Sequence, residues 1–158
     1  HFVSLDVYFY SLDSFKTNVL DAKLAATKAV TETVTVGGSA EIIDAFANAR
    51  EVKLGADVKA TVAPVTIEAE ATYAVFGKTV DAKATVTYVA DMFKAYGKFS
   101  AGMSFANEFA MTKIAPEVGV STTKVVDGAE LSLTWKGADF AKTANKKGAI
   151  AATATITL

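Results

Sequence analysis

Glu51-Val-Lys-Leu-Gly-Ala-Asp-Val-Lys-Ala-Thr-Val62 is the stretch that decides the fold. Its even-numbered positions are all apolar, whereas its odd-numbered positions are charged residues, threonine or glycine. Successive side chains of a β-strand point to opposite sides, so strict alternation with a period of two is the pattern of a strand with two different faces. The stretch therefore predicts a long strand with one apolar and one polar face.

The apolar positions change parity at three places further along the chain. They become odd after Ala63-Pro64, even after Gly77-Lys78 and odd again after Ala90-Asp91. With two-residue loops, these reversals keep apolar side chains on one face of an antiparallel sheet. We therefore expect a four-stranded antiparallel meander over about residues 51–106.

Two-residue loops also fix the expected register of this meander. At the turns, it pairs Val62 with Val65, Val75 with Val80, and Tyr88 with Phe93. On the polar face, it pairs Lys59 with Glu68, Asp57 with Glu70, and Lys83 with Lys98, and it sets Lys83 diagonal to Glu70. The like-charge pairs would be unfavourable in a dry interior and are tolerable if this face is wet.

Alternation predicts further strands in the flanks, at residues 2–12, 112–122, 129–136 and 148–158, and a Thr-rich, β-branched composition predicts one at 24–36. We expect loops at 13–23, 123–128 and 137–147. Residues 39–50 fit either a short helix or a strand followed by a loop. The sequence leaves open whether a tenth strand forms at 13–23 or at 39–50. We expect ten strands, with eight as the alternative, because closed single-chain barrels prefer even counts.

Composition excludes several classes of function. The chain has no Cys, and its single His is at position 1, so thiol chemistry, internal catalytic triads and Cys- or His-based metal sites are excluded. A net charge of -1 is unlike that of a nucleic-acid binder. Glu68 and Glu70 share a strand face, but we interpret them as solvated carboxylates. We expect no enzyme, no metal and no cofactor.

Three features favour membrane strands over a soluble fold. The central strands are expected to be about 11–15 residues long, whereas soluble strands usually have about 5–6. Short turns between long strands give an up-and-down order that closes into a barrel. Aromatic residues stand at both ends of the strands, as in interfacial girdles: Tyr73, Phe76, Phe105 and Phe109 at one end, and Tyr88 and Phe93 at the other. We therefore predict an all-β, antiparallel, transmembrane β-barrel of 8–10 strands, with a soluble β-sandwich as the alternative.

In such a barrel, the polar face would line the lumen and the apolar face would meet lipid. The expected pore-lining residues are Lys53, Lys59, Glu68, Glu70, Lys83, Lys94 and Lys98. The expected lipid-facing residues include Val58, Ile67, Ala71, Val80, Val86 and Ala101. Mixed charges predict passive diffusion with weak ion selectivity. The alternative function is a soluble surface adhesin without pore activity.

Over roughly residues 50–158, the chain resembles the major outer sheath protein family of treponemes and its repeat-protein relatives. The resemblance is carried by Lys53-Leu-Gly-Ala-Asp-Val-Lys-Ala, Ile114-Ala-Pro-Glu-Val-Gly-Val-Ser, Ala129-Glu-Leu-Ser-Leu-Thr-Trp and Lys147-Gly-Ala-Ile-Ala-Ala-Thr-Ala-Thr-Ile-Thr-Leu. It implies a spirochaete outer-membrane porin and surface antigen, trimers, and adhesion to host matrix proteins such as fibronectin and laminin. The chain ends in Leu158, whereas many outer-membrane barrels end in an aromatic residue.

The chain is expected to form one domain over residues 1–158. It opens in the middle of an apolar alternating pattern, His1-Phe-Val-Ser-Leu, without the basic segment and cleavage site of a signal peptide. We therefore expect a fragment cut from a longer chain or a renumbered one, and the resemblance implies that it is the C-terminal part.

Overall fold

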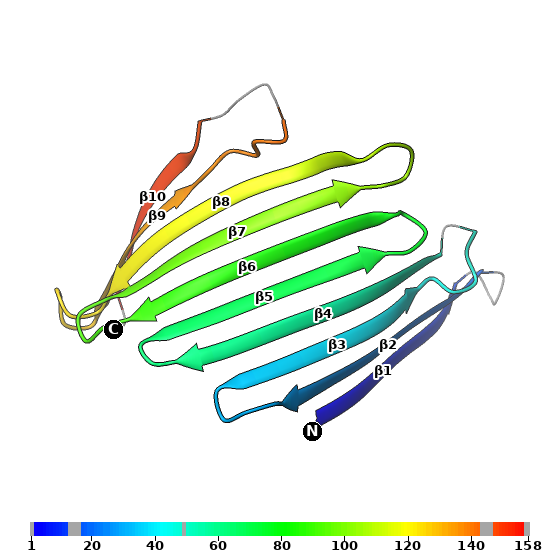
Figure 1. Cartoon of the computed structure of the whole chain (residues 1–158), viewed down its shortest axis with the longest axis horizontal. Helices are drawn as coiled ribbons and strands as arrows, with labels where there is room; N and C mark the ends of the chain where they lie inside the picture. Colours follow the sequence, from blue (N-terminus) through cyan, green and yellow to red (C-terminus); the bar gives the residue numbers. More distant parts are fainter. Residues whose placement is uncertain (1, 13–16, 49, 143–146, 157–158) are drawn as a thin grey trace.

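The computed structural model describes residues 2–12, 17–48, 50–142 and 147–156. Ten strands form one antiparallel sheet in which each strand pairs with its neighbours in the chain, in the order β1 to β10. Figure 1 shows this sheet as a single curved layer whose edge hairpins turn out of the plane of the central strands. The strands are β1 Phe2–Leu12, β2 Thr17–Ala29, β3 Val34–Ile43, β4 Glu51–Val62, β5 Val65–Ala74, β6 Thr79–Val89, β7 Lys94–Ser104, β8 Ala110–Thr122, β9 Ala129–Lys136 and β10 Ala149–Ile156.

The connections gather at two ends of the sheet. One end, named here the Pro64 end, holds the turns 30–33, 63–64, 90–93 and 123–128. The opposite end, the Gly77 end, holds the connections 75–78 and 105–109, together with those that join β3 to β4 and β9 to β10. The prediction of ten up-and-down strands is confirmed, and β4 to β7 form the predicted meander.

The register of the meander differs from the predicted one by two residues at two of its three turns. Val62 pairs with Val65 as expected, but Tyr73 pairs with Val80 and Tyr88 with Ala95. The predicted pairs Val75–Val80 and Tyr88–Phe93 are therefore wrong. A shift of two residues leaves every side chain on its predicted face, because the faces alternate with the same period.

The shift arises because these two turns contain four residues instead of two. In the turn 75–78, the Glu51 carboxylate accepts hydrogen bonds from the amides of Phe76 and Gly77, at 2.9 Å each, and Lys78 adopts a positive φ of 50°. In the turn 90–93, the Ala90 amide bonds to the Phe93 carbonyl at 2.9 Å. The wider turns shorten the four central strands to 10–12 residues, near the lower limit of the expected range.

Two predictions for the N-terminal flank are wrong. Residues 17–23 belong to β2 instead of a loop, while residues 13–16 lie outside the described part of the chain. The predicted strand 24–36 is divided by a turn at 30–33, where the Thr31 side chain accepts hydrogen bonds from the amides of Thr33 and Val34. Residues 39–50 continue a strand to Ile43 and then form a loop, so the strand-plus-loop alternative is confirmed over the described residues.

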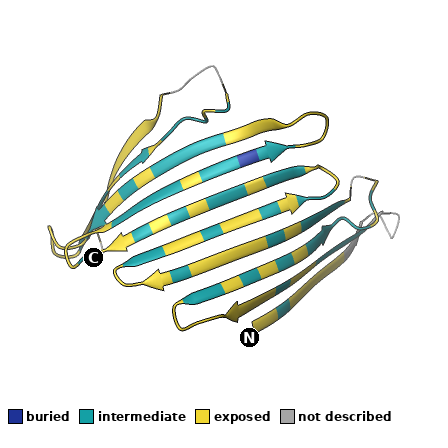
Figure 2. Cartoon of the chain, viewed as in Figure 1, coloured by how far each residue is buried: buried dark blue, intermediate teal, exposed yellow. Residues whose placement is uncertain are grey.

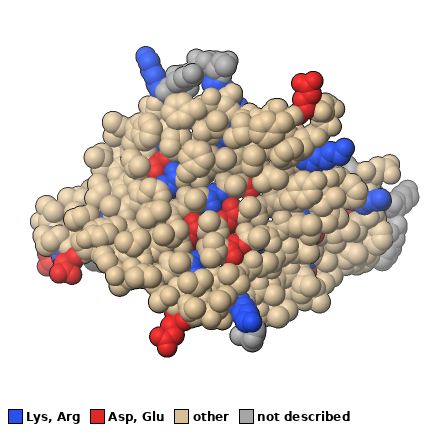
Figure 3. Space-filling model, in the orientation of Figure 1, with Lys and Arg blue, Asp and Glu red and all other residues tan. Residues whose placement is uncertain are grey.

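The sheet has one charged and one uncharged face. Cross-strand pairing and strand alternation place every charged residue of the ten described strands on the same face, except Lys28 near the end of β2. The residues predicted to face inward and those predicted to face outward therefore lie on opposite faces of the sheet. Figure 3 shows a largely uncharged surface with a small central group of charged residues and others at the periphery.

The described residues contain no hydrophobic core. Gly102 is the one described residue that is buried, and Figure 2 shows β10 exposed along its length and exposed and half-buried residues on the other strands. Large apolar side chains such as Leu54, Val118 and Ile150 are 48%, 51% and 74% exposed. The sheet by itself therefore leaves both of its faces uncovered.

A glycine on β8 makes room for an aromatic ring on the charged face. Gly119 pairs with Tyr96 of β7, and a Cβ atom at Gly119 would overlap the Tyr96 ring. Next to Tyr96, Gly97 points to the opposite face, where an added Cβ would meet nothing within 4 Å. The two glycines therefore provide a matched pair of positions with opposite steric surroundings.

We expect Gly119→Ala to lower the free energy of unfolding by about 1–3 kcal/mol, because the ring must leave its place. Gly97→Ala should be neutral or slightly stabilising, since glycine weakens a strand interior. Denaturant unfolding measures both values. Equal effects of the two substitutions would contradict the placement of Tyr96 over Gly119.

Candidate functional site: the charged face of the sheet

Cross-strand pairing arranges the charged face into rows that run across the strands. The first row crosses β1 to β4 and alternates in sign: Asp6 pairs with Lys23, Lys23 with Glu41, and Glu41 with Lys53. Opposite charges directly across a strand pair stabilise a sheet, whereas like charges destabilise it. The row therefore joins the strands of the N-terminal half by favourable neighbours.

A second row crosses β4 to β9, and it also alternates in sign. Its members, in order, are Lys59, Glu68, Thr85, Lys98, Glu117 and Lys136. Lys59 Nζ lies 3.0 Å from Glu68 Oε1, and Lys98 Nζ lies 3.6 Å from Glu117 Oε2. The threonine between Glu68 and Lys98 separates the two ion pairs.

Between these rows, the charges are less balanced. Asp57 pairs directly with Glu70, as predicted, and Glu70 forms an ion pair with Lys83. The predicted Lys83–Lys98 pair is wrong, because Lys83 faces Ser100 across the shifted register. Lys83 stands opposite Glu70 instead of diagonal to it, so one unfavourable neighbour is replaced by a favourable one.

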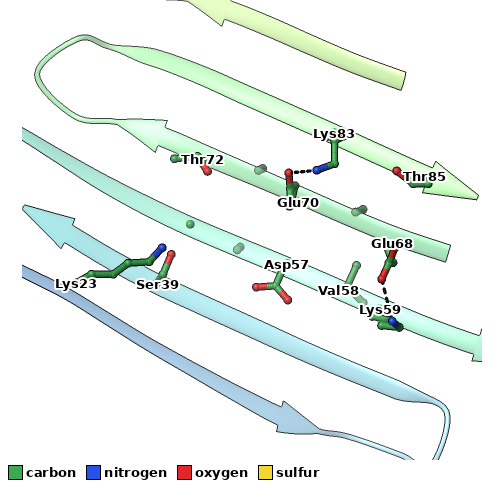
Figure 4. Close-up of a pocket in the computed structure, with 14 residues that line it drawn as sticks. Lys23, Ser39, Asp57, Val58, Lys59, Glu68, Glu70, Thr72, Lys83 and Thr85 are labelled. Carbon is green, nitrogen blue, oxygen red and sulfur yellow. Dashed lines mark hydrogen bonds and ion pairs between the residues drawn. The ribbon is translucent and has the colours of Figure 1, made fainter. Parts of the chain in front are cut away.

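A hollow of about 470 Å³ lies over β2 to β6 on this face. Figure 4 shows the side chains that line it, with the ion pairs Lys59–Glu68 and Lys83–Glu70 on neighbouring strands and Lys23, Ser39 and Asp57 beside them. The lining offers ammonium groups, carboxylates and hydroxyls close together. Such a surface can exchange hydrogen bonds with water and with polar solutes of either charge.

All seven residues predicted to line a pore lie on the charged face. They are Lys53, Lys59, Glu68, Glu70, Lys83, Lys94 and Lys98. Lys59, Glu68, Glu70 and Lys83 come together at the hollow, while Lys98 lies further along the second row. Lys53 belongs to the first row, and Lys94 begins β7 at the Pro64 end.

Sequence reasoning missed the partners that the flanking strands supply. Lys23 and Glu41 complete the first row, and Glu117 and Lys136 complete the second. Glu117 is the least exposed member of the ion pairs, at 17% for its side chain, and it also accepts a 2.7 Å hydrogen bond from the Tyr96 hydroxyl. The alternating pattern of the flanking strands indicates the face on which these residues lie. Which residues become their neighbours depends on the turn lengths.

The ion pairs themselves contribute little to stability. Lys59 and Glu68 have side-chain exposures of 56% and 49%, and exposed pairs are worth about 0–1 kcal/mol each. The charged face is therefore held in place by backbone pairing, and its charges remain available to water and solutes.

At the Gly77 end, carboxylates bind the backbone amides of neighbouring segments. Asp21 of β2 accepts the Asp44 amide at 2.6 Å, and Glu51 of β4 accepts two amides of the turn 75–78. Asp139, after β9, accepts the Ile114 amide of β8 at 2.8 Å. These three contacts attach the connections of this end to adjacent strands.

At the Pro64 end, hydroxyl groups take the corresponding role. Thr31 binds the turn 30–33, and the Thr122 hydroxyl donates a hydrogen bond to the Met92 carbonyl in the turn 90–93. The aromatic pairs also divide between the ends, with Tyr88–Phe93 at this one and Phe105–Phe109 at the Gly77 end, at centroid distances of 6.0 and 5.5 Å. The prediction that aromatic residues mark both ends of the strands agrees with this arrangement.

The structure thus defines an all-β, up-and-down sheet with one charged and one apolar face. Comparison of the chain with models of protein families, with curated proteins and with solved structures gave no match. The resemblance to treponemal outer sheath proteins therefore stays a prediction from the sequence. Within the described ranges, no group of three His, Asp or Glu side chains could hold a metal ion. The same part of the chain has no helix that could span a membrane.

Asp139 links the β9–β10 connection to β8 through its charge. The hydrogen bond from the Ile114 amide holds the pKa of the Asp139 carboxyl below its usual value of 3.8. The Ala141 amide and the charges of Lys142 and Lys113 act in the same direction, while desolvation opposes them. Because the pKa is lowered on folding, the stabilisation is fully present above about pH 4 and is lost as pH falls through the lowered value.

We therefore expect Asp139→Ala to reduce stability at neutral pH, and this difference from the wild type to disappear as the pH falls below about 4. Asp127→Ala, which removes a carboxylate at the Pro64 end without removing a hydrogen bond to a loop amide, is the control. Thermal unfolding across a pH series measures the difference. A difference that persisted unchanged at pH 2 would show that Asp139 acts without its charge.

Proposed function

We propose that this chain forms an outer-membrane β-barrel porin through which small solutes diffuse passively. In this proposal, the uncharged face of the sheet meets lipid and the charged face lines a water-filled lumen. Localisation in a bacterial outer membrane, exposure at the cell surface and ion transport belong to the same proposal.

The exposed apolar face is the observation that carries the proposal. It extends over all ten described strands with a single charged residue, Lys28, and its side chains are uncovered. Water is a poor environment for an apolar surface of this extent, since the largest patches of soluble monomers are about 300–600 Å². Hydrocarbon would cover this face without a protein partner.

The arrangement in one layer weighs against the soluble alternative. A β-sandwich buries its apolar residues between two packed sheets. Here the ten described strands belong to one sheet, and no second layer covers the apolar face. Strands of 10–12 residues in the meander also match the length of about 9–11 residues that a tilted strand needs to cross hydrocarbon.

The charged face supports passive transport with weak selectivity. Its two rows alternate in sign, and strong selection would need rings of one charge. Mixed pairs such as Lys59–Glu68 offer contacts to both cations and anions without holding either tightly. Assembly into trimers and adhesion to fibronectin or laminin are proposed from the sequence resemblance alone.

Purified, folded protein should produce stepwise conductance in a planar lipid bilayer. Because the charges of the lumen are mixed, we expect the reversal potential in a salt gradient to stay close to zero. Heat-denatured protein is the control. A soluble adhesin would give no conductance steps, would be monodisperse without detergent, and would not change its gel mobility on heating.

Spin labels on adjacent residues of β4 test which face meets lipid. In liposomes, a label at Val58→Cys should be relaxed by oxygen dissolved in the bilayer, and a label at Lys59→Cys by a water-soluble nickel complex. The two positions differ by one residue, so backbone depth is matched and only the face changes. Shielding of the Val58 label from both reagents would mean that this face is buried in protein.

A further inference from the structure

The two edges of the sheet each present an unpaired row of backbone groups. Among the described residues, β1 pairs only with β2, and β10 only with β9. Free edges of this kind are sites where another strand adds. Since ten strands alternate in direction, β10 runs antiparallel to β1, and the two edges could form a regular antiparallel ladder.

The strand ends advance steadily across the sheet. When the second row is continued from Lys59 towards the N-terminal strands, it meets β2 at Ala29. This is the last residue of β2 at the Pro64 end. The same row meets β9 at Lys136, seven residues after Ala129, the first residue of that strand at the same end. The ends therefore advance by seven residues over the seven steps from β2 to β9, which is one residue per strand. The row continues to Ala149 on β10 and, in the register of the β1–β2 hairpin, passes two residues before Phe2.

This advance means that the strands are tilted relative to the line that joins their ends. A rise of about 3.4 Å per residue against a strand spacing of about 4.8 Å corresponds to a tilt of about 35°. Closed barrels tilt their strands by about 35–45°. Ten strands with this advance would return to the first strand with a stagger of ten residues.

We propose that β1 and β10 of the same chain pair with each other in this register, with Val3 opposite Ile156 and Phe9 opposite Ile150. The pairing uses all of β10 and joins apolar residues on the apolar face, while Asp6 meets Thr153 on the charged face. A stagger of twelve would set Ile150 opposite Ser11, where the apolar alternation of β1 has ended. The inference rests on the proposed function, because closure makes the charged face the wall of a lumen.

A second copy of the chain is the rival occupant of each edge. The single chain is favoured because the stagger of ten that its own strand ends define is one of the two parity-matched staggers, ten and twelve, at which all of β10 overlaps β1. Pairing within the chain also removes both edges at once, whereas two copies paired along a single seam leave one edge of each copy free.

Engineered disulfides can test this register directly, because the chain contains no cysteine. In the proposed ladder, Leu5 lies opposite Ala154, and directly opposed residues have Cα atoms about 4.5–5.5 Å apart, within the range that a disulfide spans. Leu5→Cys/Ala154→Cys should therefore oxidise to a cross-linked monomer in detergent micelles or liposomes. The control Leu5→Cys/Ile150→Cys uses the same face but displaces one partner by four residues, about 13 Å.

We expect the first variant to form at least about tenfold more cross-linked monomer than the control, independent of protein concentration, with equal β-sheet circular dichroism in both. Three outcomes would overturn the proposal: no bond in the first variant, a bond in Val7→Cys/Ala154→Cys instead, or a disulfide-linked dimer that increases with concentration. The last would assign the edges to a second copy.

Conductance of the oxidised first variant separates this inference from the proposed function. Cross-linked monomer without conductance steps would leave the closed sheet standing and remove the porin. Conductance from a protein in which Leu5→Cys and Ala154→Cys never join would keep the porin and remove this closure.

Discussion

Cross-strand pairing with matched parity is the constraint on which the rest of the structure depends. The number of residues between the last paired positions of two neighbouring strands must bring the charged positions of one strand opposite those of the next. The turns 63–64 and 75–78 both contain an even number of residues. They join strands in which the charged positions are odd-numbered in one strand and even-numbered in the other. The connection 44–50 contains an odd number of residues, and it joins β3 and β4, whose charged positions are both odd-numbered. The connection 105–109 has an odd number of residues, although the charged positions of β7 and β8 differ in parity. A bulge in β8, opposite Gly102 and Met103, corrects this, and Lys113 and Glu117 thereby reach the charged face.

The faces of the sheet could be predicted from the sequence, because alternation is a local property of each strand. The residues of β4 to β7 lie on their predicted faces even where the register is shifted by two. The turn lengths could not be predicted, because they depend on contacts between distant residues, such as the Glu51 carboxylate with the amides of Phe76 and Gly77. The turn 30–33 was missed because it contains neither glycine nor proline, and its local signal is the hydroxyl of Thr31.

The candidate site could be predicted in part for the same reason. Lys59–Glu68 was correct because a two-residue turn at Ala63-Pro64 fixes it. The two charge rows were not visible in the sequence, since each requires the registers of several hairpins at once. Glu117 shows the difficulty well, because its contacts with Lys98 and Tyr96 follow from the bulge in β8 as well as from pairing.

The absence of a core in the described residues has a consequence for how the sequence can vary. On the apolar face, side chains such as Leu54 and Val118 are about half exposed, so exchanges among Val, Ile, Leu and Ala there disturb no packed neighbour. On the charged face, Tyr96 fits over Gly119 and reaches Glu117, so a change at one position restricts the other two. Substitutions are therefore expected to accumulate singly on the apolar face and in linked groups on the charged face.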